Sequence, residues 1–339
     1  MNHWIQQRKA RKEAEQQEEV TLLEAIDRVV EDADPRIKLV SHYQRKLSQA
    51  VQHALQYIDG LVARVPAPVE VNSKTWLTNP YLNAFFATVD DLQMVFSRSP
   101  ALRHFFERHA LAECYAGLMM TRQEKKVLGM QLSGDVIQKD VPQLTVSFVD
   151  HRVKMPTATE AEARAEFKRR ALRFLVTQAL ERVLSLRTER ENLQKQKQIL
   201  QLKIKILQGK QNGFPSLSKN GEDIESQLAS LQQKLAENKE ELQEISVQID
   251  ELDDYVDLLN DILGHAENYL ALEQVSMKLS RLGVKLEENS TEPGNELILP
   301  EFIGDKQQRR VIVLVKYPRV EMLSQEEIYL RAGRYLTAL

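Results

Sequence analysis

The stretch that decides the expected fold is ALRFLVTQALERVLSLRTERENLQKQKQILQLKIKILQ, residues 171–208. Apolar residues recur there at alternating three- and four-residue steps, interrupted only by Arg190 and Lys197. A second segment, Glu222–Leu286, carries the same repeat, and Gly209–Gly221 joins it to the first segment, Thr159–Gln208. A period of 3.5 residues keeps one stripe of a helix facing a partner helix, so both segments predict coiled-coil helices.

The charges of the two segments indicate that they pair with each other. Thr157–Gln211 contains 13 Lys and Arg against 6 Asp and Glu, whereas Gly221–Glu287 contains 5 against 16. Two copies of either segment would repel along their flanks, and the connecting loop is short. We therefore expect an antiparallel hairpin, in a register that places Arg190 opposite Asn238 and Leu186 opposite Leu242. A slip of seven residues would preserve the stripe, so that register stays open as well.

Short strands are expected on both sides of this hairpin. Gln143–Met155 alternates and is rich in β-branched residues, and Arg310–Tyr317 is a short apolar run. Glu296–Ile303 predicts an edge strand, because Pro300 lacks the donor that a central strand needs. Residues Val20–Val30, Arg36–Val65 and the segment from Pro100 to about Gly129 are expected to be helical.

The predicted fold class is therefore mostly α: a helical N-terminal domain, a long antiparallel coiled-coil hairpin, and a small antiparallel β element at the hairpin base. We expect five parts, namely a charged N-terminal segment, the helical domain, a strand leading into the hairpin, the hairpin with its tip loop 209–221, and C-terminal strands with a helix opened by Ser324-x-x-Glu327. Their bounds are 1–19, 20–142, 143–156, 157–287 and 288–339.

Composition excludes several classes of protein. The 339 residues have a formal net charge of −3, so no global field favours nucleic acid or an anionic membrane. The single Cys114 excludes a disulfide framework, and no stretch of about 18 apolar residues suggests a membrane span. The cations near Trp4 are cancelled by the glutamates that follow, so peripheral membrane binding is not expected either. We expect a soluble protein of the cytoplasm.

No pattern in the chain indicates an enzyme, a cofactor or a metal. None of the 12 glycines falls in a phosphate-binding loop. His104, His109 and Cys114 are spaced by five residues, which points them in different directions around a helix. Asp150 and His151 are neighbours in an expected strand and so face opposite sides. An enzyme whose site is assembled in the N-terminal and β regions stays as a lesser alternative.

A basic cluster is the best nucleic-acid candidate. Lys168, Arg169, Arg170 and Arg173 lie between Phe167 and Phe174, and exposed cations of this kind could contact phosphates. In the expected register they face the acidic run Asp250–Asp261, which would neutralise them instead. A nucleic-acid-associated protein is therefore the alternative reading, and nucleic acid is not the expected partner.

The remaining hypothesis is a non-enzymatic scaffold that presents a helical hairpin to partner proteins. At the hairpin tip, Phe214 and Leu217 could either anchor a partner or fold back over the last layer of the hairpin. Leu263, Ala266 and Leu270 would face residues too small or too polar to cover them, so they need either the N-terminal domain or a second subunit, and we also expect a homo-oligomer. The identity of the partners does not follow from the sequence.

Overall fold

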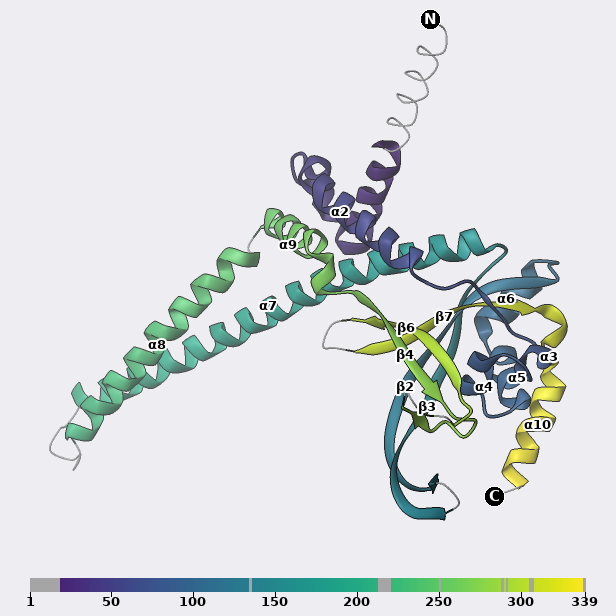
Figure 1. The fold of residues 1–339 in the computed structure, drawn as a ribbon. Coiled ribbons are helices and arrows are strands. Elements are labelled where there is room, and N and C mark those ends of the chain that lie inside the picture. The colour runs from purple at the N-terminus through teal and green to yellow at the C-terminus, as the bar shows by residue number, and fades with distance from the viewer. Residues whose placement is uncertain are drawn as a thin grey trace, which may run out of the picture. The chain divides into compact units, whose positions relative to one another are not determined.

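A computed structural model describes residues 19–133, 136–212, 221–249, 251–287, 290, 292–304 and 308–337. The chain divides into two compact units, one of residues up to Ala54 with Arg173–Ala266, the other of Leu55–Leu172 with Glu267–Leu339. The second unit contains a seven-stranded sheet (Figure 1). The expected fold class, a mostly helical protein with only a small β element beside a coiled-coil hairpin, is therefore wrong.

The sheet has the strand order β3-β2-β7-β6-β4-β5, and these neighbours pair antiparallel. The seventh strand, β1, pairs in parallel with β7. Strands before and after the long helices thus meet in one sheet. The bounds are β1 Val69–Glu70, β2 Glu113–Ser133, β3 Val136–Thr157, β4 Ala271–Leu279, β5 Lys285–Leu286, β6 Asn295–Ile303 and β7 Arg309–Pro318.

The longest strands are β2 and β3, of 21 and 22 residues, which pair with each other along a curved hairpin. The first part of β2 overturns the expectation of a helix to about Gly129. Its side chains at alternate positions, Cys114, Ala116, Leu118 and Met120, are all fully buried, which is the period of a strand. The apolar run from Ala116 to Met120 hides this alternation in the sequence, and pairing with β3 and β7 overrides the helix preference of Leu and Met.

The sheet curls until its two ends touch. The amide of Val146 in β3 donates to the carbonyl of Gly283, 2.8 Å away, and Thr145 bridges Val284. Gly283 follows β4 in a tight turn with φ of +78°, a conformation that favours glycine. Part of the outer edge of β3 is thereby paired rather than left open.

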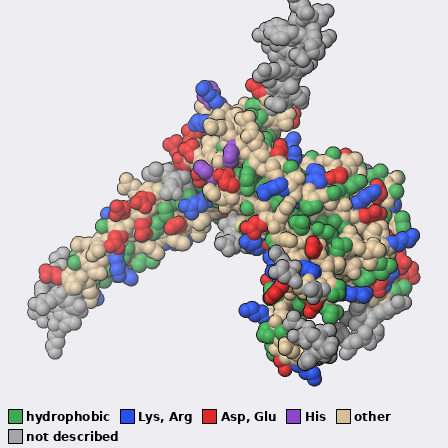
Figure 2. Space-filling model, in the orientation of Figure 1, with side chains coloured by type: hydrophobic (Ala, Val, Ile, Leu, Met, Phe, Trp, Pro, Cys, Tyr) green, Lys and Arg blue, Asp and Glu red, His purple; other side chains and the backbone are tan. Residues whose placement is uncertain are grey.

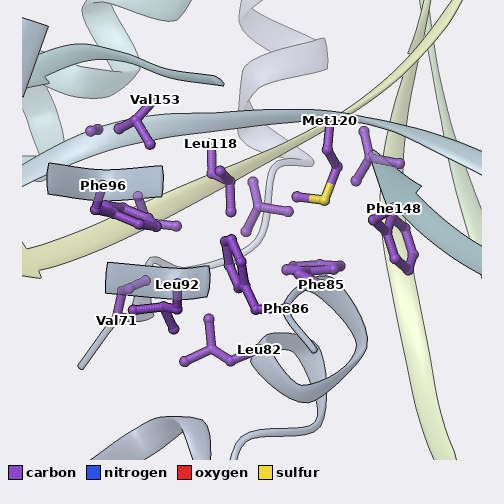
Figure 3. Close-up of a cluster of buried hydrophobic side chains, with 14 of the residues drawn as sticks. Val71, Leu82, Phe85, Phe86, Leu92, Phe96, Leu118, Met120, Phe148 and Val153 are labelled. Carbon is purple, nitrogen blue, oxygen red and sulfur yellow. The ribbon is translucent and has the colours of Figure 1, made fainter. Parts of the chain in front are cut away.

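Four short helices lie on the concave face of this sheet, and Figure 3 shows Phe85, Leu92 and Phe96 from them together with Leu118 and Met120 of β2. Polar N-caps start each one, including the expected Ser99 before Pro100. Their buried side chains, such as Phe85, Phe96 and Leu102, pack against Leu118 and the other inward residues of the strands. The helices are α3 Ser73–Trp76, α4 Pro80–Phe85, α5 Val89–Ser97 and α6 Pro100–Arg108.

A side chain of α4 accepts a hydrogen bond from β6 where β6 no longer pairs with β7. Strand β6 pairs with β7 only from Glu301 to Ile303, and beyond that point the amide of Ile298 donates to the hydroxyl of Tyr81 at 3.3 Å. Pro300 lies two residues from Ile298, so its missing donor points to the same side. A proline is tolerated within β6 because β7 has already separated from it there.

The start of α7 (Glu160–Asn212) packs on the opposite face of the sheet and contacts the end of α2 (Tyr43–Ala63). A Cβ atom on Gly117 would lie 2.6 Å from Met155 Cε and 3.1 Å from the Phe167 ring, so this glycine permits close packing of α7 on β2. The guanidinium of Arg164 donates to the carbonyls of Val62 and of the nearby loop. The start of α7 is thus fixed to α2 and to the sheet.

The C-terminal helix, α10 (Gln325–Thr337), follows a short 3₁₀ turn, η5 (Arg319–Glu321). Its start has the expected reciprocal cap, because the Ser324 amide donates to the Glu327 carboxylate at 2.7 Å and the Glu327 amide donates to Ser324 Oγ at 3.2 Å. Arg331 then pairs with Asp90 of α5 at 2.7 Å. The ion pair between Arg331 and Asp90 attaches α10 to the helices of the concave face.

The other unit is helical within the residues that the structure describes. It comprises a helix over residues 19–33, η1 (Pro35–Leu39), the first half of α2, the greater part of α7, α8 (Gly221–Ile249) and α9 (Leu252–Gly264). Its buried apolar residues come from all of these helices, as with Ile26, Leu47, Val176 and Leu259, and α8 contributes Ile245. A short 3₁₀ turn, η3 (Ala266–Asn268), follows α9.

Candidate interaction surface on helix α7

Helices α7 and α8 run side by side (Figure 1), and they pack against each other through apolar side chains. Leu186 and Leu193 of α7 are buried in one cluster with Ile245 of α8, and Leu242 packs against it. Between these layers the side-chain amide of Asn238 donates to the carbonyl of Leu193 at 3.2 Å. The two helices are therefore antiparallel, as a tight connection between them requires.

The register differs from the expected one. Asn238 donates to the Leu193 carbonyl and lies 3.5 Å from Gln196 Oε1, beyond the expected partner Arg190, and Leu186 and Leu193 share a cluster with Ile245 and Leu242. A slip of a whole heptad keeps the apolar stripes in contact, so the repeat leaves more than one register open. The stripe could therefore be predicted from the sequence more securely than the register.

A shallow groove of about 360 Å³ runs between the two helices where their side chains diverge. Half of its wall comes from α7 and half from α8, and basic and acidic side chains both line it. The lining residues are Gln196, Ile199, Leu200, Lys203, Lys234, Glu237, Asn238 and Glu241. A mixed wall of this kind suits a protein surface better than a buried small molecule.

Aliphatic side chains of α7 stay exposed at the rim of this groove and beyond it. Ile199, Leu202 and Ile206 are 52%, 59% and 51% exposed, and Leu184 is 65% exposed. Basic residues predominate on α7 and acidic residues on α8, and carboxylates gather along the α8 side of the pair (Figure 2). These four residues lie outside the single stripe that the apolar repeat of α7 predicts to face α8.

The expected tip residues, Phe214 and Leu217, lie outside the residues that the structure describes. Whether they anchor a partner or close the end of the helical pair stays a prediction.

The basic cluster at the start of α7 is paired with carboxylates of neighbouring residues. Lys168 contacts Asp59 of α2 at 2.6 Å, and Arg169 and Arg170 both contact Glu166 at 2.7 and 2.9 Å. Arg173, in the other unit, contacts Asp32 at 3.1 Å. These partners differ from the acidic run 250–261 that the expected register would supply. The neutralisation itself leaves fewer free cations for phosphate groups.

Asp150, His151 and Arg152 do not converge on a reaction site. Asp150 has a positive φ of 62° and faces Arg310 at 3.4 Å and Arg152 at 3.9 Å. His151 turns inward and lies over Phe86, with ring centroids 4.8 Å apart, and burial lowers its pKa below the ordinary value. A charge relay between the two neighbours is therefore not formed.

The other histidines and the cysteine are also dispersed. His109 packs on Phe105 at the end of α6, and His104 lies on the same short helix. Cys114 is fully buried in β2, where burial raises its pKa to about 12. Among the described residues, no group of three or more His, Cys, Asp and Glu side chains is arranged to hold a metal ion.

A pocket of about 440 Å³ opens at the closed edge of the sheet, between α4, β3 and the turn after β4. Phe85 and Phe148 form part of its wall, and Arg281 is the one charged residue of its lining. Asp150, His151, Arg152 and His104 do not line it. The pocket therefore lacks the acid and base that the enzyme alternative would require.

Sequence reasoning missed a charged network on the inner face of the sheet. Glu301 is 1% exposed, and its carboxylate accepts from Arg122 at 2.6 Å and from Arg309 at 3.3 Å. Arg122 also pairs with Glu124, and Arg309 with Glu273 at 2.7 Å. Burial would raise the pKa of Glu301, but the two guanidiniums hold it below its usual range. Every carboxylate of this group has a cation, which indicates a structural role.

No known protein family, curated protein or solved structure matches this chain. In the part of the chain that the structure describes, no helix is long and apolar enough to cross a lipid bilayer.

Proposed function

We propose that this protein is a non-enzymatic interaction protein that presents the α7/α8 helical pair to partner proteins. The observation that carries the proposal is the surface of α7, a continuous helix of 53 residues with four large aliphatic side chains at least half exposed. Exposed apolar surface on a helix is unfavourable in water unless another molecule covers it.

The competing functions have weaker support. A nucleic-acid-binding protein needs free cations, whereas Lys168, Arg169, Arg170 and Arg173 each have a carboxylate within 3.1 Å. An enzyme needs converging acid, base or metal ligands, and the dispersed histidines and the saturated network around Glu301 do not supply them.

The three residues that led us to expect a homo-oligomer are covered within the chain. Leu263, Ala266 and Leu270, expected to be uncovered, are 0%, 0% and 7% exposed within the chain. Self-association therefore stays a prediction, and these three residues no longer support it. A reducing compartment such as the cytoplasm stays part of the proposal, since the chain has a single cysteine.

Site-specific photo-cross-linking tests the proposed function. A photoreactive phenylalanine analogue at Leu202, incorporated in the cells that naturally make the protein, should give a discrete adduct with a second protein. The same analogue at Lys154, an exposed position of β3, serves as the control. The proposal fails if several positions along α7 and α8 give no adduct while positions on the sheet do.

A further inference from the structure

The far side of α7 carries a second apolar stripe. Ile199, Leu202 and Ile206 are spaced by three and four residues, which places them on one side of a helix. Leu202 is nine residues from Leu193, so the two side chains point about 180° apart at 100° per residue. Since Leu193 faces α8, Leu202 faces away from α8, with Ile206 beside it and Ile199 nearer the rim of the groove between the two helices.

Lysines surround this stripe. Residues 192–212 include Lys195, Lys203, Lys205 and Lys210 as exposed residues and contain no Asp or Glu. Among the described residues, none of these four ammonium groups lies within ion-pair distance of a carboxylate. The far side of α7 is therefore an apolar strip bordered by lysines, of which Lys203 also lines the groove that contains Glu237 and Glu241. Such a border attracts carboxylates and repels other lysines.

A second copy of this chain does not fit the stripe. Placing α7 on α7 would bring the lysines of both copies together. Placing the outer side of α8 there would bring Glu237, Glu240 and Glu244, and α8 exposes no large aliphatic residue in its described part. The charge would match, but the apolar strip would find no apolar partner.

We propose that the stripe of Ile199, Leu202 and Ile206 binds an amphipathic helix of another protein, one whose apolar side is flanked by Asp and Glu. Three aliphatic anchors at helical spacing are the usual footprint of a helix docked along a helix. The lysines would pair with the flanking carboxylates and fix orientation and specificity. The inference rests on the proposed function and names the chemical class of partner.

An anionic membrane is the other surface that attracts cationic apolar helices. Helices that lie in the membrane interface commonly insert Trp or Phe beside their aliphatic residues. Residues 175–212 contain no aromatic residue, and three half-exposed aliphatic side chains give little area to insert. These features favour a protein helix over a lipid surface.

The probe is a synthetic four-heptad peptide with leucine at its core positions, glutamate on both flanks and a fluorescent label. Anisotropy titrations compare the full chain with a variant carrying Ile199→Gln, Leu202→Gln and Ile206→Gln, all at exposed positions where glutamine retains helix propensity. Leu184→Gln removes an equally exposed leucine outside the lysine border and is the matched control. A scrambled peptide of the same composition controls for charge alone.

We expect the acidic peptide to bind the wild-type chain and the Leu184→Gln variant, and to bind the triple variant at least about tenfold more weakly. Lys203→Glu with Lys210→Glu should also abolish binding, and added salt should weaken it. No binding to the wild type, or equal binding to the triple variant or of the scrambled peptide, would overturn the inference.

Two further measurements test whether the stripe binds a membrane or a second copy of the chain instead. Co-sedimentation with phosphatidylglycerol vesicles that is lost in the triple variant, without peptide binding, would make it a membrane surface. A dimer in analytical ultracentrifugation that the triple variant dissociates would make it a self-association surface. If a photo-adduct at Leu202 persists while the peptide fails, the partner class is wrong and the proposed function stands.

Discussion

Replacing Glu301 with glutamine should strongly destabilise the unit that contains the sheet. Glu301 is 1% exposed, and the Arg122 side chain that it holds is 16% exposed. Removing one member of a buried pair leaves a desolvated charge and costs about 3–5 kcal/mol. Because Arg122 keeps Glu124 as a second partner, we expect about 3 kcal/mol, at the low end of that range.

Urea denaturation followed by tryptophan fluorescence would measure this loss. In a Trp4→Phe background the remaining Trp76 lies in the unit that contains the sheet, with its indole N–H donating to the Phe86 carbonyl at 3.1 Å. Glu273→Gln is the matched control, since the Glu273 and Arg309 side chains are 52% and 44% exposed, and it should cost less than about 1 kcal/mol.

The pH dependence gives a second test of the same pair. Despite its burial, the pKa of Glu301 is lowered by Arg122 and Arg309. The stabilisation from ionised Glu301 is therefore present above the ordinary value of 4.5 and is lost as pH falls through the lower folded-state value. The difference in the free energy of unfolding between wild type and Glu301→Gln should be largest at pH 7 and should shrink in acid.

A loss below about 0.5 kcal/mol for Glu301→Gln, or one equal to that of Glu273→Gln, would refute the reasoning. Replacing the pair together, with Glu301→Leu and Arg122→Met, should restore stability to near the wild-type value or above it. A double variant as unstable as the single one would mean that the fold needs the charges themselves.

Three other outcomes are expected. Gly117→Val should lower stability by about 1–3 kcal/mol, because the new side chain would collide with Met155, as thermal melting can show. Cysteines at Leu186 and Ile245, which share one cluster, should form an intrachain disulfide on oxidation, detectable by reduced and non-reduced electrophoresis. Burial lowers the pKa of His151, so stability should fall as pH drops below about 6.5, and less so in His151→Phe.

Each of these outcomes has a control. Gly60→Ala in α2 should be neutral or stabilising, because a Cβ atom there meets nothing within 4 Å, so a loss as large as that of Gly117→Val would contradict the steric argument. Purely intermolecular disulfides would contradict the pairing of α7 with α8, and the buried Cys114 should not compete. Equal pH profiles for wild type and His151→Phe would show that another group titrates.

The apolar stripe of the long helices could be predicted from the sequence, but its register could not. Leu186, Leu193 and Ile245 are buried as the repeat implies. The actual layer is chosen by side-chain fit, such as the hydrogen bond from Asn238 to the Leu193 carbonyl, and the repeat alone does not encode that fit. The second stripe was visible in QILQLKIKILQ, where Ile199, Leu202 and Ile206 interleave with the residues that face α8.

The sheet was harder to predict because most of its stabilising contacts are distant in sequence. Strong local signals place Arg310–Tyr317 in β7 and Gln143–Met155 in β3. Strand β2 carries helix-forming residues, and its alternation becomes clear only when both neighbouring strands are present. The burial of Glu301 could have been predicted, since it follows Leu297 and Leu299 at the two-residue spacing of strand positions on one face, and both leucines are buried. A carboxylate at an inward position predicts a buried cation partner.

The order of the strands has a consequence for synthesis on the ribosome. The edge of β2 from Glu113 to Met120 pairs with β7, which begins about 190 residues later at Arg309. At elongation rates of about 5–20 residues per second, this edge waits on the order of ten seconds or more for its partner. During that time a row of unpaired amides and carbonyls beside Leu118 and Met120 is open to pairing with other chains. Nascent chains stopped before β7 should therefore require a chaperone far more than the finished protein does.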